Sequence, residues 1–270
     1  MSMTAEEFSK LAQFIQATYG IYLRQEKKVM LKSRLDQLLA RKHISSYSEY
    51  FDYVKNDQTG RAASVLVDKI TTNHTYFMRE VEHFHFLRDH VVPMLARSIK
   101  DRDLRIWSAG CSTGEEPYTL AMILLDHFAL QRHSWDTKVL ATDISSRVLQ
   151  VAQQGRYQSE QLGKLPQHWK DNYFVKSDDD HYVVDKKLRA EVIFRKLNLM
   201  DDHFPFKRKF HIIFCRNVMI YFDHHTRQRL IQKFTNLLEP GGYLFIGFSE
   251  TLDKRETSLK YIMPAVYRKV

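Results

Sequence analysis

The chain has 270 residues, of which 44% are hydrophobic and 13% aromatic, so it can fill the core of a globular protein and is not disordered. Its 41 Lys and Arg residues against 32 Asp and Glu residues give a net charge of +9, which favours an acidic partner: a nucleic acid, an anionic membrane or an acidic protein surface. Two cysteines are too few for a disulfide framework, and no apolar run reaches the length of about 20 residues that a membrane helix needs. The acidic N-terminal segment is unlike a signal peptide, so we expect a cytoplasmic protein.

Residues 1–72 show the spacing of several short helices. Apolar residues recur three or four positions apart, and no proline occurs before Pro93. Gly20 and Gly60 are typical of helix ends. We therefore predict an all-α N-terminal domain at 1–72, followed by a linker and a lead-in helix at 73–100.

From residue 101 to residue 270, short apolar runs alternate with helical stretches. The candidate strands are 104–107, 138–142, 210–215 and 243–247, and the candidate helices lie at 117–128, near 145–154 and near 224–238. This alternation predicts an α/β domain with a parallel sheet that helices cover on both faces. Residues 155–198 interrupt the pattern, and strands at 182–184 and 191–194 around the polar turn 177–180 predict a small inserted antiparallel β subdomain.

A loop of small residues follows the first candidate strand at 108–117. Gly110 and Gly114 permit tight turns and a close ligand approach, at the strand ends where open α/β sheets bind ligands. The spacing is not a dinucleotide fingerprint, and no phosphate-binding Gly-Lys-Ser/Thr follows. Glu115 and Glu116 would suit a cationic ligand, and a plain strand–helix turn is the alternative.

Polar residues in three more segments are expected near the same mouth of the sheet. Asp143 ends the second strand, where a carboxylate commonly binds ribose hydroxyls, although it could equally cap the next helix. Arg216, Asn217 and Tyr221 follow the third strand. The segment 71–80 groups polar residues around two aromatics, which a linker with a helix cap explains about as well as a binding site.

Three motifs, in this order, resemble those of the CheR-type chemotaxis receptor methyltransferases. Residues 72–80 are similar to the family's Thr-Asn-x-Thr-x-Phe-Phe-Arg-Glu signature, with Met78 in place of the second Phe. The Ser-Ala-Gly-Cys-Ser-Thr-Gly-Glu-Glu-Pro-Tyr loop corresponds to 108–118, and the Cys-Arg-Asn-Val-Met-Ile-Tyr-Phe segment to 215–222. The resemblance covers nearly the whole chain, and motifs of this length do not recur in order by chance.

The resemblance implies a helical N-terminal domain and a Rossmann-like S-adenosylmethionine-dependent methyltransferase domain with a small antiparallel β subdomain. It implies S-adenosylmethionine as the methyl donor, with S-adenosylhomocysteine as the product. The acceptors would be glutamates in the acidic coiled-coil cytoplasmic region of methyl-accepting chemotaxis receptors, giving glutamyl 5-O-methyl esters for adaptation. The donor-binding residues that it implies are Asn73, Thr75, Arg79, Gly110, Glu116, Asp143, Asn198, Leu199, Arg216 and Asn217.

The same resemblance implies Arg79 and Tyr221 as catalytic residues, Glu116 as the partner of the donor's ammonium and Asp143 as the partner of its ribose. A glutamate carboxylate is ionised at neutral pH and a sulfonium-bound methyl is already activated, so we expect no general base and no metal. We hypothesise that the planar fork of Arg79 orients the acceptor carboxylate and that Tyr221 shapes the methyl position.

Lys27, Arg34 and Arg41 are seven residues apart and share one side of a predicted helix. They form either a solvated face or a docking surface for a glutamate-rich receptor helix. The β subdomain is the candidate for binding a receptor C-terminal peptide, because an exposed sheet edge can accept an added strand.

Two other function classes fit the sequence less well. A nucleic-acid methyltransferase would suit the positive charge, but enzymes that methylate base amino groups carry Pro-Pro after the Asn or Asp, whereas Val218 and Met219 follow Asn217. A non-catalytic module with this fold would not need intact cofactor and catalytic positions. We expect neither a nucleic-acid partner nor membrane insertion.

Overall fold

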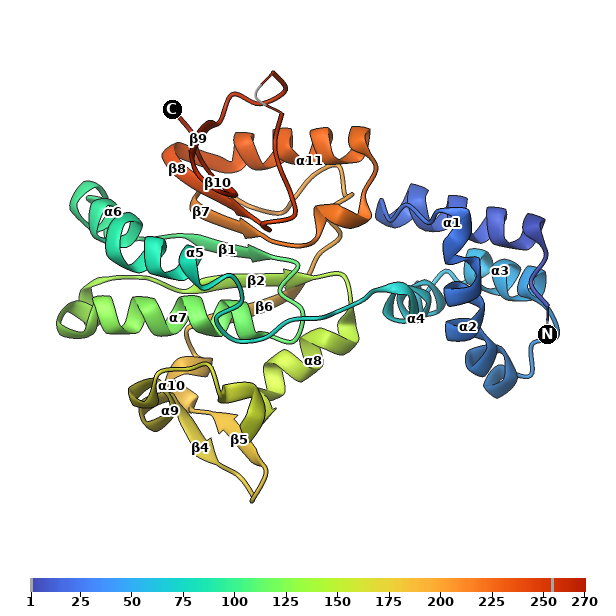
Figure 1. Ribbon diagram of the computed structural model, residues 1–270, viewed down its shortest axis with the longest axis horizontal. Coiled ribbons are helices and arrows are strands. Elements are labelled where there is room, and N and C mark those ends of the chain that lie inside the picture. Colours follow the sequence, from blue (N-terminus) through green and yellow to red (C-terminus); the bar gives the residue numbers. More distant parts are fainter. Residues whose placement is uncertain (1, 254) are drawn as a thin grey trace.

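The computed structural model describes residues 2–253 and 255–270. Figure 1 shows a lobe of N-terminal helices on one side, a central sheet flanked by helices, and a small lobe around β4 and β5 that projects from the body. In the part of the chain that the structure describes, no helix combines the length and apolarity needed to cross a membrane.

Four helices form the N-terminal lobe, with a 3-10 turn before the second. They are α1 (Ala5–Tyr19), η1 (Gln25–Lys27), α2 (Lys28–Lys42), α3 (Tyr47–Asn56) and α4 (Arg61–Ile70). Thr4 and Glu7 form a reciprocal capping box that starts α1, and Gly20 ends this helix in the left-handed region with φ 72°. The predicted all-α N-terminal domain is thus confirmed.

The segment 71–80 leads from this lobe into a nearly continuous helical stretch. This helical stretch consists of α5 (Val81–Phe86), the π-helical segment η2 (Leu87–Val91) and α6 (Val92–Ser98). Phe84, Leu87 and Val92 are buried against the sheet. The lead-in helix therefore anchors one end of the segment 71–80 on the sheet.

Seven strands form the central sheet in the order β6-β2-β1-β7-β8-β10-β9. They are β1 (Ile106–Ala109), β2 (Val139–Asp143), β6 (Val192–Lys196), β7 (Phe210–Cys215), β8 (Leu238–Ile246), β9 (Lys260–Met263) and β10 (Val266–Arg268). The first five in the order are parallel, and β10 runs antiparallel to β8 and β9. The strand order reverses between β1 and β7, where an open α/β sheet forms its ligand crevice.

Helices cover both faces of this sheet, as predicted. The remaining helical segments of the large domain are α7 (Glu115–His127), η3 (Ala129–Ser134), α8 (Ser146–Gln154), η5 (Met219–Tyr221) and α11 (His224–Leu237). Successive strand residues point to opposite faces: Ile212 and Phe214 pack in the core with α5 and α7, whereas Ile213 and Cys215 pack with α11 and the N-terminal helices.

The small lobe contains a three-stranded antiparallel sheet in the order β3-β5-β4. Its elements are β3 (Arg156–Gln158), η4 (Ser159–Leu162), α9 (Gln167–Tyr173), β4 (Phe174–Lys176), β5 (His181–Val184) and α10 (Lys186–Arg189). The polar turn 177–180 joins β4 to β5, so the predicted small antiparallel sheet is present.

The prediction that 191–194 belongs to this small sheet is wrong. β6 instead pairs parallel to β2, with Val192 opposite Val139, at one edge of the large sheet. A short apolar run has the same pattern in either sheet, and the path of the chain after α10 decides between them. Only the first part of the predicted insertion 155–198 therefore forms the small lobe.

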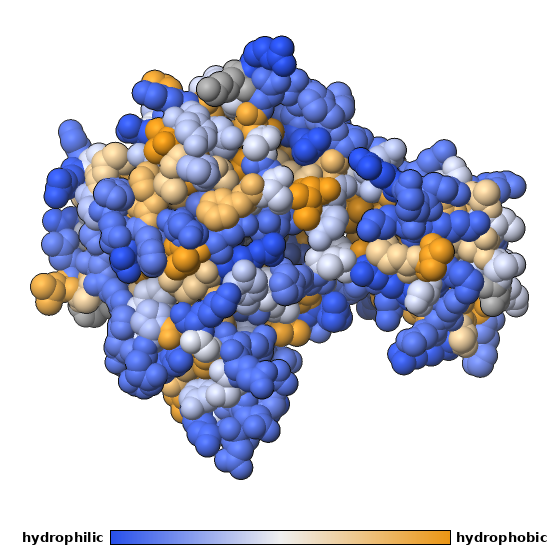
Figure 2. Space-filling model, viewed as in Figure 1, coloured by the Kyte–Doolittle hydropathy of each residue, from blue (hydrophilic) through white to orange (hydrophobic). Residues whose placement is uncertain are grey.

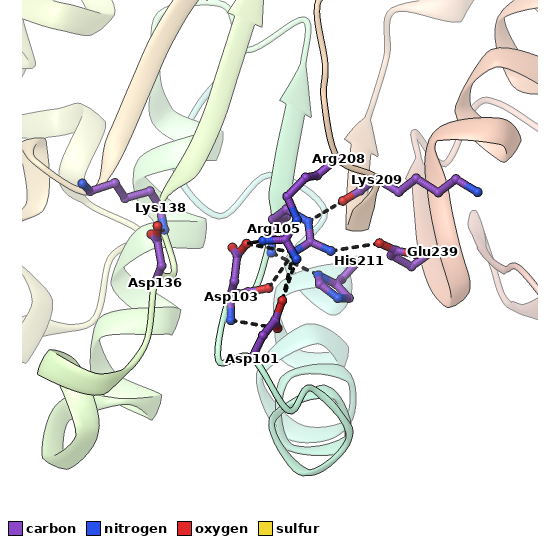
Figure 3. Close-up of polar contacts among 9 residues, drawn as sticks. All are labelled: Asp101, Asp103, Arg105, Asp136, Lys138, Arg208, Lys209, His211 and Glu239. Atoms are coloured by element: carbon purple, nitrogen blue, oxygen red, sulfur yellow. Dashed lines mark hydrogen bonds and ion pairs between the residues drawn. The ribbon is translucent and has the colours of Figure 1, made fainter.

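The amino ends of the central strands are held by an ion-pair network that Figure 3 shows around Arg105. Arg105 Nη1 donates to Asp103 Oδ2 and Nη2 donates to Glu239 Oε1, both at 2.9 Å. Its Nε donates to the carbonyl oxygen of Lys209 at 2.5 Å. This network joins the starts of β1, β7 and β8. The carboxyl ends of these strands lie at the opposite edge of the sheet.

Candidate active site

One pocket lies at the carboxyl ends of β1, β2 and β7, next to the segment 71–80. It is a cleft that is open to solvent on one side, and both polar and apolar side chains line it. Its lining includes every donor-binding and catalytic residue inferred from the sequence: Asn73, Thr75, Arg79, Gly110, Glu116, Asp143, Asn198, Leu199, Arg216, Asn217 and Tyr221. The structure thus gathers these residues around one space, and their individual roles stay predictions.

The loop after β1 brings bare backbone to the pocket wall. Gly110 has φ 82°, and its N–H donates to the carbonyl oxygen of Thr142 at 2.8 Å. A Cβ at this position would overlap the side chain of Val218, so glycine is required both for the conformation and for the space.

Asp143 is buried at the end of β2 with both carboxylate oxygens aimed at backbone N–H groups. Oδ2 accepts from Ser112 N and Oδ1 from Ser145 N, each at 2.9 Å. Burial raises the pKa of Asp143, and these N–H groups partly offset that effect. The cap of α8 is Ser145, whose Oγ accepts from Val148 N at 3.3 Å, so Asp143 is not the cap of this helix, and it lines the pocket.

Glu116 lies in the first turn of α7 with its carboxylate in the pocket wall. Its Oε1 accepts from Ser108 Oγ at 2.7 Å, and its Oε2 accepts from Arg216 Nη1 at 3.1 Å. Burial raises the pKa of Glu116, and the nearby Arg216 guanidinium opposes this shift. The neighbouring Glu115 accepts from Thr113 Oγ1 instead and does not line the pocket, so of the two acidic residues only Glu116 can meet a cationic ligand.

Arg79 and Tyr221 are both tied to the backbone of the segment 71–80. Arg79 Nη1 donates to the carbonyl oxygen of His74 at 2.7 Å, and the Tyr221 hydroxyl donates to that of Thr72 at 3.2 Å. Burial raises the pKa of the Tyr221 hydroxyl, against the influence of Arg79. Within the described part of the chain, no carboxylate forms an ion pair with Arg79.

The helical lobe supplies one wall of the pocket. Tyr19 and Ile21 line it, and Asn198 Nδ2 donates to the carbonyl oxygen of Thr18 at 2.8 Å. Figure 2 shows a mostly hydrophilic surface with scattered hydrophobic residues, some of which lie where the helical lobe meets the body. Both domains therefore contribute to the site, although the sequence placed it at the sheet and the linker.

The three basic residues proposed for docking lie outside the pocket, and one of them has a structural role. Lys27 and Arg41 are exposed, whereas Arg34 is partly buried. Arg34 Nη1 donates to the carbonyl oxygens of Ile70 at 2.8 Å and Thr71 at 3.3 Å, so it caps the end of α4 and holds the start of the linker. The seven-residue spacing gave no sign of this role.

Two glutamates that support the site were not singled out from the sequence. Glu250 Oε2 accepts from Asn217 N at 3.1 Å and Gly247 N at 2.6 Å, and its Oε1 accepts from Ile220 N at 3.1 Å. Glu250 holds the loop after β7 from about 30 residues downstream, and no motif or spacing near it in the sequence indicates this role.

Glu80 forms an ion pair with Arg216 at 3.1 Å. Its place in the 72–80 motif was the sequence signal that could have indicated it.

The chemistry of this lining fits a nucleoside that carries an ammonium group. Glu116 and Asp143 each keep lone pairs that their present partners leave unused, and the Gly110 backbone offers a close approach. Among the residues that the structure describes, no group of three or more His, Cys, Asp or Glu side chains is arranged to hold a metal ion. Cys111 and Cys215 are both buried with raised thiol pKa values, since burial disfavours the thiolate.

A pocket of this kind at the crevice of a parallel sheet suits a nucleoside-containing cofactor, and comparison with known proteins identifies the class of protein. The family model described as "CheR methyltransferase, SAM binding domain" matches residues 73–267, and "CheR methyltransferase, all-alpha domain" matches residues 6–71. The chain belongs to the CheR methyltransferase family, and it is an S-adenosylmethionine-dependent methyltransferase.

Curated relatives align over almost their entire length. The chain is 44% identical to the chemotaxis protein methyltransferase of Borreliella burgdorferi, over 100% of this chain and 96% of that protein. It is 35% identical to the chemotaxis protein methyltransferase of Escherichia coli, over 95% of this chain and 88% of that protein. It is also 35% identical to chemotaxis protein methyltransferase 1 of Pseudomonas aeruginosa, over 94% of this chain and 93% of that protein.

Proposed function

We propose that this chain methylates glutamate side chains on the cytoplasmic helices of chemotaxis receptors, giving glutamyl 5-O-methyl esters. Family membership supports methyl transfer from S-adenosylmethionine, and the names of the relatives connect that activity with chemotaxis. The choice of a carboxylate acceptor rests on Arg79, whose guanidinium lines the pocket. In the part of the chain that the structure describes, no carboxylate forms an ion pair with it.

Several residues of the pocket would hold the donor. When bound, S-adenosylmethionine supplies a methyl group activated on a positively charged sulfur. Glu116 would accept from its ammonium with the lone pairs that Ser108 and Arg216 leave free, and Asp143 would accept from its ribose hydroxyls. Side chains that would complete the binding surface are Asn73, Thr75, Asn198, Leu199 and Asn217.

The acceptor needs orientation more than activation. A glutamate carboxylate is ionised at neutral pH, so it is already a nucleophile. The Arg79 guanidinium can donate two parallel hydrogen bonds to a planar carboxylate and fix its direction. Tyr221, held by the Thr72 carbonyl, presents an aromatic ring to the same space, where it favours a positively charged neighbour.

The exposed basic residues of the helical lobe suit an acidic receptor surface. Lys27 and Arg41 remain candidates for docking, and the net charge of +9 favours association with a glutamate-rich partner. In the small sheet, β3 and β4 are the outer strands, and Val175 of β4 is exposed. A receptor C-terminal peptide could add to such an edge as a further strand.

The proposal is tested by incubating the full chain with methyl-labelled S-adenosylmethionine and receptor cytoplasmic fragments. We expect label on the fragment that mild base releases, because a carboxylate methyl ester is labile to base. A fragment whose candidate glutamates are replaced by alanine is the matched control and should stay unlabelled. Base-stable label, or label on added nucleic acid instead of the fragment, would contradict the proposal.

A further inference from the structure

Three charged side chains form a continuous chain from the segment 71–80 into the pocket. Arg216 lies between Glu80 and Glu116, and the N–O distance is 3.1 Å to each carboxylate. The Arg216 side chain is 2% exposed, and those of Glu80 and Glu116 are 12% and 14% exposed. With so little water around them, these groups interact more strongly than surface ions do.

The guanidinium divides its hydrogen bonds unequally between the two carboxylates. Nε and Nη2 of Arg216 both donate to Glu80 Oε2, at 3.2 and 3.1 Å, and Nη2 also donates to the carbonyl oxygen of Arg79. Only Nη1 reaches Glu116, on Oε2. The Phe84 ring lies 5.1 Å from the guanidinium carbon and supports this orientation.

Glu80 itself is held from several directions. Its Oε1 accepts from Asn217 Nδ2 at 3.3 Å and from Phe248 N at 3.2 Å. The backbones of Met78, Glu80 and Asn217 all have φ between 53° and 60°, the left-handed region that is unfavourable for residues with a Cβ. Such conformations persist where surrounding bonds over-determine them, and they gather at functional sites.

We propose that Glu80 is a positioning residue for the methyl donor, acting through Arg216 to keep Glu116 available to the donor's ammonium. By occupying Nε and Nη2, Glu80 leaves Glu116 with a single N–H from Arg216. Without the Glu80 charge, the guanidinium turns more of its donors to Glu116 and fills the lone pairs that the ammonium needs. The inference rests on the proposed role of Glu116 in donor binding.

Calorimetric titration of the full chain with S-adenosylhomocysteine, which carries the same ammonium and ribose as the donor, tests this coupling. We expect Glu116→Gln to weaken binding about tenfold, since it removes a charge-assisted hydrogen bond, and Glu80→Gln to weaken it several-fold. Glu82→Gln is the matched control, because it removes the same charge from an exposed residue two positions away and should bind as the parent chain does.

The double variant Glu80→Gln/Glu116→Gln separates positioning from general support of the fold. If Glu80 acts through Glu116, the double variant binds no more weakly than Glu116→Gln alone. A purely structural Glu80 would instead lower the unfolding temperature and add its own loss in the double variant. If Glu80→Gln does not fold, Glu80→Asp keeps the charge at a shorter reach and is expected to weaken binding to a smaller extent.

The outcomes distinguish this inference from the proposed function. Suppose that the parent chain binds and that Glu116→Gln weakens binding. If Glu80→Gln then binds as the parent chain does, the positioning role is overturned and the proposed function stays intact. Where Glu80→Gln does not fold, unchanged binding by Glu80→Asp has the same meaning. Additive losses in the double variant overturn it as well. Failure of the parent chain to bind S-adenosylhomocysteine would refute the proposed donor site and this inference together.

Discussion

The backbone N–H of Tyr22 donates to the carbonyl oxygen of Tyr221 at 2.8 Å, which joins the helical lobe to the pocket loop of the large domain. Ile21 and Phe222 form an antiparallel bridge at the same place. The proposed catalytic tyrosine is thus supported by residues about 200 positions away in the sequence. We infer that the helical lobe is part of the active site as well as a candidate docking element.

The role of Arg79 predicts a split between catalysis and binding. Arg79→Ala should lower methyl transfer about a hundredfold, because the acceptor carboxylate loses its orienting hydrogen bonds. The affinity for S-adenosylhomocysteine should fall far less. Turnover is measured with labelled donor and a receptor fragment, with binding by calorimetry, and Arg79→Lys is the control that keeps the charge without the fork. Unchanged turnover in Arg79→Ala would remove this residue from the mechanism.

Docking through the exposed basic residues predicts a salt-dependent effect on receptor KM. Lys27→Glu/Arg41→Glu should raise the KM for a receptor fragment several-fold at low ionic strength and less at high ionic strength, because salt screens surface charges. Arg34 is left unchanged, since its replacement would disturb the end of α4 and the linker.

The matched control for this variant is Arg97→Glu/Lys100→Glu at the end of α6, which makes the same charge change at exposed positions outside the helical lobe and the small lobe and should leave the KM unchanged. If Lys27→Glu/Arg41→Glu shows the parent KM at low salt, or if the control raises the KM equally, the receptor does not dock on these residues.

Gly110→Ala should destabilise the chain and disturb the donor site. The residue has φ 82°, and its new Cβ would press on Val218, so we expect a loss of about 2–4 kcal/mol in the free energy of unfolding. Gly60→Ala is the control, because Gly60 has φ 67° with no atom within 4 Å of a new Cβ, and it isolates the conformational cost of about 1–2 kcal/mol. Urea unfolding measures both. Equal losses would show that contact with Val218 is unimportant.

His83 predicts a loss of stability in mild acid. It is fully buried, its Nε2 lies 3.3 Å from the Pro264 carbonyl oxygen, and burial together with Arg216 lowers its pKa to about 4, against the opposing effect of Glu80 and Glu82. The unfolded chain, with a His pKa near ~6.5, takes up the proton first as the pH falls. The free energy of unfolding should therefore decrease between about pH 6.5 and pH 4, by up to ~3 kcal/mol from this residue.

His83→Gln provides the comparison for that effect, because it keeps a donor for Pro264 and does not titrate. Urea unfolding of both chains at pH 7 and pH 4.5 should show a smaller decrease for the variant. Equal decreases would assign the acid sensitivity to other groups.

Local sequence signals were sufficient for many of the elements and for most of the pocket, but they gave no strand at β3, β4, β9 or β10. Capping residues and apolar spacing indicated the helices, and the three motifs indicated the 72–80, 108–118 and 215–222 segments that line the site. In a parallel sheet the residues that follow the strands meet at one edge, which is why Gly110, Asp143 and Arg216 could be expected together.

Only the tertiary structure decided the relationships between distant parts of the chain. It placed β6 beside β2 instead of in the small sheet, gave Arg34 a capping role, and brought Glu80 to Arg216 across 136 positions. A sequence pattern reports how often apolar residues recur, and that spacing favours a helix or a strand. It does not report which polar groups meet after folding, because those contacts depend on where the elements pack and on which buried donors still need an acceptor.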